Sequence, residues 1–168
     1  MKRTTPLMDG VEASNLEHRN WARRRLESMV LPLAGRTIAV WGLTYKPGTD
    51  TLRRSTAVEL CRWLVRQGVH VRVHDPAAGA LPADIVSVSR FTSAQEAAAG
   101  ADALVIATEW PEYRDVDLDA LAATLKGRTV IDGNRFLGST VGHDARFTLI
   151  SVGAPDAPDN GYCASSCP

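Results

Sequence analysis

A loop that combines cations with turn-forming residues is the first segment able to do chemistry. Residues 42–55 have the sequence GLTYKPGTDTLRRS, with Lys46 and Arg53 as cations and Ser55 as the predicted N-cap of a following helix. Cationic side chains and the free backbone N–H groups of a helix N-terminus are suited to phosphate. The G-x-G-x-x-G pattern of dinucleotide-binding turns is absent from this loop. The loop is interpreted either as a phosphate site of another kind or as a turn whose charges are merely solvated.

Three more polar segments directly follow predicted strands. They are VHDP at residues 73–76, ATEWPEY at 107–113 and VIDGNR at 130–135. In an open α/β sheet, ligands bind outside the carboxyl ends of the strands, so these segments and the first loop are expected at one edge. Arg135 would add a planar guanidinium there to the compact ammonium group of Lys46. The four segments are therefore candidates for a single binding site at this edge.

Short apolar runs alternate with helical segments along the chain. Strands are predicted at residues 37–43, 69–73, 103–108, 128–132 and 147–152, and helices at residues 55–67, 93–100 and 117–125. The nearly all-apolar run at 37–43 is typical of a parallel strand covered on both faces. This alternation predicts an α/β fold, Rossmann-like and doubly wound, with a mostly parallel sheet.

Two segments flank this core. A leading helix is predicted at residues 14–30, because Ala22, Leu26 and Val30 recur at helical spacing. From residue 154 the composition shifts to Pro, Asp, Gly, Ser and Cys, which predicts a flexible C-terminal tail. We therefore divide the chain into an N-terminal segment with its helix (1–34), a Rossmann-like binding domain (35–153) and a tail (154–168).

The bulk composition narrows the classes of function. The 19 Lys and Arg residues balance the 19 Asp and Glu residues, so no net positive field attracts nucleic acid or an anionic membrane. No apolar run approaches the ~20 residues that span a bilayer. Cys61, Cys163 and Cys167 suggest neither a disulfide framework nor a metal site. We expect a cytoplasmic protein without a bound metal.

The four strand-end segments, in their order, closely resemble the C-terminal UDP-binding domain of the UDP-glucose/GDP-mannose dehydrogenase family. The resemblance covers roughly residues 11–153. Members of this family oxidise the C6 alcohol of a nucleotide sugar to a carboxylate with NAD, through a catalytic cysteine that lies upstream of this domain. The resemblance implies a UDP-sugar-binding domain without the NAD-binding domain or that cysteine, inactive as an isolated chain. It also implies a role in polysaccharide biosynthesis, with an NAD-binding dehydrogenase chain or further copies of itself as partner.

The resemblance also implies which residues form the site. Tyr45, Lys46 and Arg135 match family residues that contact the nucleotide sugar, so we expect Lys46 and Arg135 to converge on its diphosphate. Arg53 matches an arginine that reaches the NAD cofactor, which is held mainly by the other domain. No catalytic residue is expected in this chain.

Three residues beside these matches depart from the family pattern. Arg54 stands where the family usually has glutamate, Thr56 where it usually has proline, and Asn134 where arginine is common. These changes leave open a different class of function, an interaction or regulatory module that keeps the fold without the ligand. An unrelated Rossmann-like binder of CoA or NAD is a third possibility.

Other polar and reactive residues are expected to be structural. Asp75 precedes Pro76, a pair that favours a turn. Trp110 is expected to pack at the rim of the core, and Glu109 to pair with a nearby arginine. Cys61 falls on the apolar side of the helix at 55–67, which predicts an inert core thiol.

Overall fold

One sheet of six parallel strands forms the centre of the fold. The structure is a computed structural model and describes residues 6–153. The strands in these residues are β1 (Thr37–Trp41), β2 (His70–His74), β3 (Ser89–Arg90), β4 (Ala103–Ile106), β5 (Thr129–Asp132) and β6 (Thr148–Ile150). Their order is β3-β2-β1-β4-β5-β6, and every neighbouring pair is parallel. Strands β2 and β3 are added on one side of β1, and β4, β5 and β6 on the other side. The boundary between β1 and β4 is therefore the topological switch point of a doubly wound fold.

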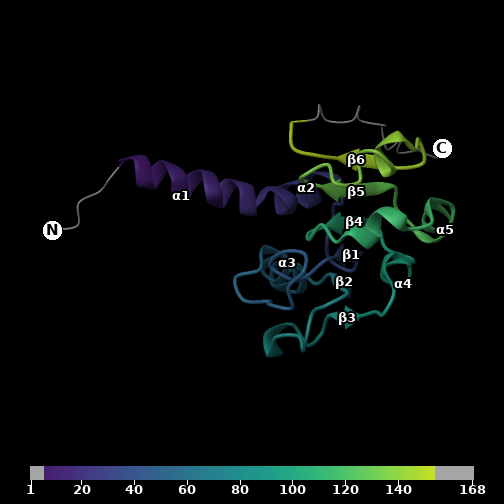
Figure 1. The fold of residues 1–168 in the computed structure, drawn as a ribbon, viewed down its shortest axis with the longest axis horizontal. Coiled ribbons are helices and arrows are strands. Elements are labelled where there is room, and N and C mark those ends of the chain that lie inside the picture. The colour runs from purple at the N-terminus through teal and green to yellow at the C-terminus, as the bar shows by residue number, and fades with distance from the viewer. Residues whose placement is uncertain (1–5, 154–168) are drawn as a thin grey trace, which may run out of the picture.

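Helices cover both faces of this sheet (Figure 1). The helices α2 (Trp21–Met29) and α3 (Thr56–Arg66) lie over one face, and α4 (Ala94–Ala98) and α5 (Leu118–Thr124) lie over the other. Alternate residues of β1 divide between the two cores, with Val40 packed on the α3 side and Trp41 on the α4 side. Because both faces are covered, the central strands are buried along their length, as their apolar sequences predict. Three short 3₁₀ helices complete the described elements: η1 (Ala83–Ile85), η2 (Pro111–Asp115) and η3 (Val141–His143).

The leading helix differs from the prediction in where it starts. The helix α1 (Pro6–Arg19) begins well before residue 14 and projects away from the sheet (Figure 1). The backbone ladder continues through Asn20 into α2, because Asn20 N donates to Leu16 O and Arg24 N donates to Asn20 O. The predicted start at residue 14 was therefore wrong. Proline is tolerated in the first turn of a helix, where its missing N–H would have no partner anyway.

Three other helices begin at the polar residues that the sequence indicated. Ser55 accepts hydrogen bonds from two backbone N–H groups of α3, and Asp117 accepts from two of α5. Ser93 accepts from Glu96 N at the start of α4. The predicted α/β fold with a doubly wound parallel sheet is confirmed, and the sheet is parallel throughout.

Some expectations are not met or fall outside the described residues. The edge strand β3 was not predicted, because it consists of two exposed residues without an apolar alternation. The predicted tail, with Cys163 and Cys167, lies outside the described residues. Within residues 6–153, no helix is both long and apolar enough to cross a bilayer.

The carboxyl ends of β1 and β4 approach each other very closely at Gly42. This glycine has a φ of 87°, and a Cβ atom added to it would lie 2.6 Å from the backbone nitrogen of Thr108. Gly48, in the following loop, also has a positive φ of 77° but has no atom within 4 Å of such a Cβ. The two glycines therefore separate the effect of the backbone angle from that of the close contact.

We expect Gly42→Ala to lower the free energy of unfolding by about 2 to 4 kcal/mol, since it combines a left-handed alanine with a steric clash. Gly48→Ala is the matched control and should cost about 1 kcal/mol, from the backbone angle alone. Urea unfolding of both variants and the wild type measures the difference. Equal losses would contradict the close approach of the two strand ends.

Candidate functional site

The carboxylate of Asp75, directly after β2, organises the carboxyl edge of the sheet. Its Oδ2 atom accepts hydrogen bonds from Leu43 N at 2.6 Å, Thr44 N at 2.9 Å and Thr44 Oγ1 at 3.0 Å. Its Oδ1 atom accepts from Ala77 N and Ala78 N at 2.9 and 2.7 Å, which is the turn expected before Pro76. Asp75 therefore forms the predicted turn, and it also fixes the start of the loop that follows β1.

The indole of Trp110 joins this network from the loop after β4. Its Nε1 atom donates to both Thr44 Oγ1 and Asp75 Oδ2 at 3.2 Å. Thr108 Oγ1 donates to Thr44 O at 2.6 Å in the same place. Side chains and backbone thus occupy the switch point between β1 and β4. The Asp75 carboxylate, with six donors, has no capacity left to hold a ribose as the acidic residue of a dinucleotide-binding fold does.

A third link joins the loop after β4 to the loop after β5. Asn134 Nδ2 donates to Glu109 Oε1. The expectation that Glu109 pairs with an arginine was wrong, because its partner is the side-chain amide of Asn134 in the loop after β5. The Asp75, Thr44, Trp110 and Glu109 contacts therefore connect all four strand-end segments in series.

Arg135 lies in a tight turn at the end of β5. Leu137 N donates to Asp132 Oδ2 at 2.7 Å, and Arg135 N and Gly138 N close the turn through backbone hydrogen bonds. Arg135 has a φ of 57°, a left-handed conformation that costs a residue other than glycine about 1 kcal/mol or more. Its side chain is exposed beyond the turn.

The predicted site residues are distributed between two loops. Tyr45 and Arg53 line one open cavity of about 380 Å³ together with Thr51 and Arg54. Tyr45 N donates to Thr51 O at 2.9 Å, and this bond brings the two ends of the loop together. Lys46 is the next residue in that loop; it is exposed and does not line this cavity.

A second cavity, of about 140 Å³, lies nearer to β5. It is bounded by the last turn of α1, the first turn of α3 and the ends of β4 and β5, and Asn134 lines it. Arg135 lines neither cavity. The structure therefore brings Tyr45 and Arg53 together and leaves Lys46 and Arg135 as exposed cations on separate loops that are tied through Thr44, Trp110 and Glu109.

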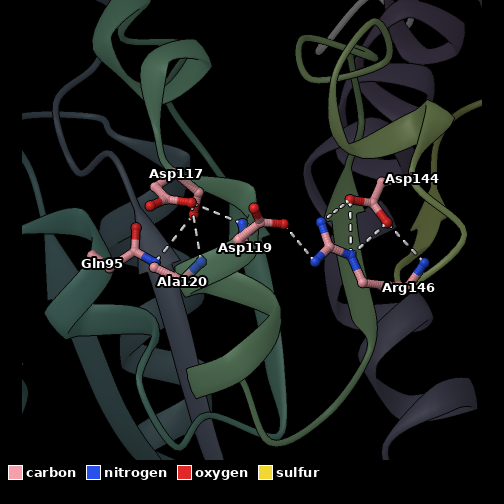
Figure 2. A network of polar contacts seen from close by, with 6 residues as sticks. All are labelled: Gln95, Asp117, Asp119, Ala120, Asp144 and Arg146. Carbon is pink, nitrogen blue, oxygen red and sulfur yellow. Dashed lines mark hydrogen bonds and ion pairs between the residues drawn. The ribbon is translucent and has the colours of Figure 1, made fainter.

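The cations of these two loops lack partners within the described part of the chain. No side-chain hydrogen bond or ion pair in residues 6–153 involves Lys46, Arg53, Arg54 or Arg135. Some basic residues elsewhere are paired: Lys126 Nζ lies 2.8 Å from Asp102 Oδ1, and Figure 2 shows Arg146 between Asp144 and Asp119 of α5. Unpaired cations gathered on one edge are the groups that a phosphate-bearing ligand would neutralise.

Three buried side chains, His74, Tyr113 and Cys61, have pKa shifts that favour their uncharged forms. His74 Nδ1 lies 3.2 Å from the Tyr113 hydroxyl, and that hydroxyl donates to His74 O. Burial lowers the pKa of His74 and raises that of Tyr113. Burial also raises the pKa of Cys61 to about 12, and this free thiol is fully enclosed in the core, as predicted. No group of His, Cys, Asp and Glu in the described chain could hold a metal ion.

Two opposing effects set the pKa of Asp75. Burial alone would raise it, but the backbone N–H groups of Leu43, Thr44, Ala77 and Ala78 together outweigh burial and lower the pKa below its usual value. Since the pKa is then lower in the folded state than in the unfolded chain, the ionised carboxylate stabilises the fold above about pH 4. That stabilisation is lost as the pH falls through the folded-state pKa.

We expect Asp75→Asn to lower the free energy of unfolding by about 2 kcal/mol at pH 7, because its amide presents a donor to N–H groups that need an acceptor. The difference from the wild type should shrink as the pH falls from about 5 to about 3. Chemical denaturation across this range measures it, with the exposed Asp115→Asn as control. A difference that stays constant with pH would show that Asp75 is not the ionised acceptor.

The comparisons with known proteins agree with this architecture. The model of the UDP-binding domain of the UDP-glucose/GDP-mannose dehydrogenase family matches residues 39–139. A UDP-glucose 6-dehydrogenase from Pseudomonas aeruginosa is 37% identical over 139 residues, which are 79% of this chain and 30% of that protein. The UDP-glucose 6-dehydrogenase TuaD of Bacillus subtilis is 30% identical over 89% of this chain and 33% of its own length.

Solved structures give the same result. A UDP-glucose dehydrogenase from Pyrobaculum islandicum aligns with a TM-score of 0.65 and 33% identity, over 74% of this chain and 28% of that one. A UDP-D-ManNAc dehydrogenase from Pyrococcus horikoshii aligns with a TM-score of 0.72 and 25% identity, over 90% and 34%.

These matches establish the class of protein: an α/β domain of the kind that binds UDP in nucleotide-sugar dehydrogenases. The chain belongs to the UDP-glucose/GDP-mannose dehydrogenase family. It spans about a third of the length of the curated relatives that it matches.

Proposed function

We propose that this chain binds a UDP-sugar at the carboxyl edge of its sheet, through Tyr45, Lys46 and Arg135. The observation that supports the proposal is the set of unpaired cations on two loops whose bases are joined by hydrogen bonds. An ammonium group from one loop and a guanidinium from the other suit two phosphates of one ligand. Tyr45, which is 61% exposed, offers a ring for packing against the ligand.

The NAD cofactor would be held mainly by another chain or domain. The switch point of this sheet is occupied by Trp110 and Thr108, and the Asp75 carboxylate is saturated, so the residues present do not fit a dinucleotide in the usual crevice. Arg53 is unpaired and lines an open cavity, and it suits a contact to a phosphate of NAD bound next to this domain. NAD, when bound, accepts the hydride from the sugar alcohol. The partner would be an NAD-binding dehydrogenase chain or a further copy in an oligomer.

We expect the isolated chain to bind the UDP-sugar without oxidising it. In the described residues the one cysteine is Cys61, which is enclosed in the core and kept protonated by its raised pKa, so it cannot act as a thiolate nucleophile. A mixture of the chain, UDP-glucose and NAD should produce no NADH by absorbance. NADH formation would contradict this part of the proposal.

Titration calorimetry with UDP tests the binding itself. We expect Lys46→Ala and Arg135→Ala each to weaken UDP binding about ten-fold or more, because each removes a charge-assisted contact to phosphate. The matched controls are Lys126→Ala and Arg128→Ala, which remove an exposed cation of the same type near the opposite ends of the strands.

The controls should bind UDP within about two-fold of the wild type, an allowance for long-range charge effects. No heat with UDP or UDP-glucose at millimolar concentrations would instead favour a module that keeps the fold without the ligand. Equal losses in all four variants would indicate a non-specific effect of charge rather than a site.

A further inference from the structure

Arg54 lies beside Arg53 at the end of the loop after β1, and both line the cavity that contains Tyr45 and Thr51. Neither guanidinium has a hydrogen-bonding or ion-pairing partner within residues 6–153. The half-buried arginine Arg62, by contrast, is paired with Asp84. Two adjacent guanidinium groups without a carboxylate repel each other, and an anion between them would relieve that repulsion.

The backbone holds Arg54 in this place at a cost. Its φ is 60°, and Arg54 and Arg135 are the two residues other than glycine with a positive φ in the described chain. Ser55 N donates to Leu52 O, and the buried Ser55 caps α3, so the turn is fixed on its helical side. Leu52 is partly buried against the core and fixes the other side.

A glycine would adopt this backbone angle freely, whereas an arginine is strained by about 1 to 3 kcal/mol. The conformational strain at Arg54 therefore points to a binding role for its side chain that offsets the strain. Residues held in such conformations cluster at ligand-binding sites, and the second strained arginine, Arg135, belongs to the proposed site.

We propose that Arg54 is a specificity-determining residue, which with Arg53 forms a two-guanidinium clamp for a diphosphate group and selects it over a monophosphate. The inference rests on the proposed function and adds to it a residue that departs from the family pattern. A diphosphate offers oxygens on two phosphorus atoms, so each arginine can form its own forked contact, whereas a single phosphate satisfies one arginine. The diphosphate could belong to the UDP-sugar or to NAD.

The test compares ligands as well as variants, by calorimetry on the full chain. Arg54→Gly removes the guanidinium and keeps the backbone angle at no steric cost, so it should fold with an unchanged or higher melting temperature. Its affinity for the diphosphate ligand that the clamp holds, UDP or NAD, should fall about ten-fold, and its affinity for the matching monophosphate, UMP or nicotinamide mononucleotide, by less than about three-fold. Arg54→Lys, which keeps the charge and loses the fork, should fall between.

Parallel titrations with NAD and nicotinamide mononucleotide identify the source of the diphosphate. A selective loss for UDP assigns the clamp to the nucleotide sugar, and a selective loss for NAD assigns it to the cofactor. Arg128→Ala is the control. It should leave unchanged the ratio of the affinities for UDP and UMP and the ratio of the affinities for NAD and nicotinamide mononucleotide. If Arg54→Gly keeps the wild-type affinities for UDP and NAD, the clamp is wrong while the proposed UDP site stands. If the wild type binds neither ligand, the clamp and the proposed function both fail.

Discussion

The carboxylate of Asp75 is the interaction on which the arrangement of the carboxyl edge depends. A buried carboxylate is costly unless donors surround it, and here the donors come from its own turn, from the loop after β1 and from Trp110 after β4. The same group that ends β2 thereby sets the path of the loop that carries Tyr45 and Lys46. Burial and hydrogen bonding are thus used to position a loop rather than to bind a ligand directly.

This arrangement explains how a Rossmann-like sheet can belong to a UDP-binding family without the glycine-rich turn of a dinucleotide site. Gly42 permits the ends of β1 and β4 to approach closely, and Thr108 and Trp110 then fill the switch point. The residues proposed to bind the ligand lie further out on the loops, where Lys46 and Arg135 are exposed and without side-chain partners in the described chain. A rigid, hydrogen-bonded base below exposed cations is the kind of preorganisation that lowers the cost of binding a charged ligand.

Much of the fold was predictable because its signals are local. The apolar runs of β1 and β4, the cap Ser55 and the start of the helix at Asp117 depend on neighbouring residues in the sequence, and they were identified correctly. The contacts that tie the loops together join residues far apart in sequence, so Glu109 was assigned the wrong partner and the full role of Asp75 was missed. The two-residue strand β3 and the cavity position of Arg54 likewise follow from tertiary packing and backbone angle, which the sequence pattern does not display.

A crystal structure of this chain with UDP is the most direct test of the central claim that two linked loops hold one diphosphate. We predict that the ammonium nitrogen of Lys46 and a guanidinium nitrogen of Arg135 both lie within about 3 Å of oxygens of the same diphosphate. The Asp75, Thr44 and Trp110 hydrogen bonds should be unchanged beneath it. A diphosphate bound by one of these loops while the other cation faces solvent, or one bound away from this edge, would rule out this binding mode.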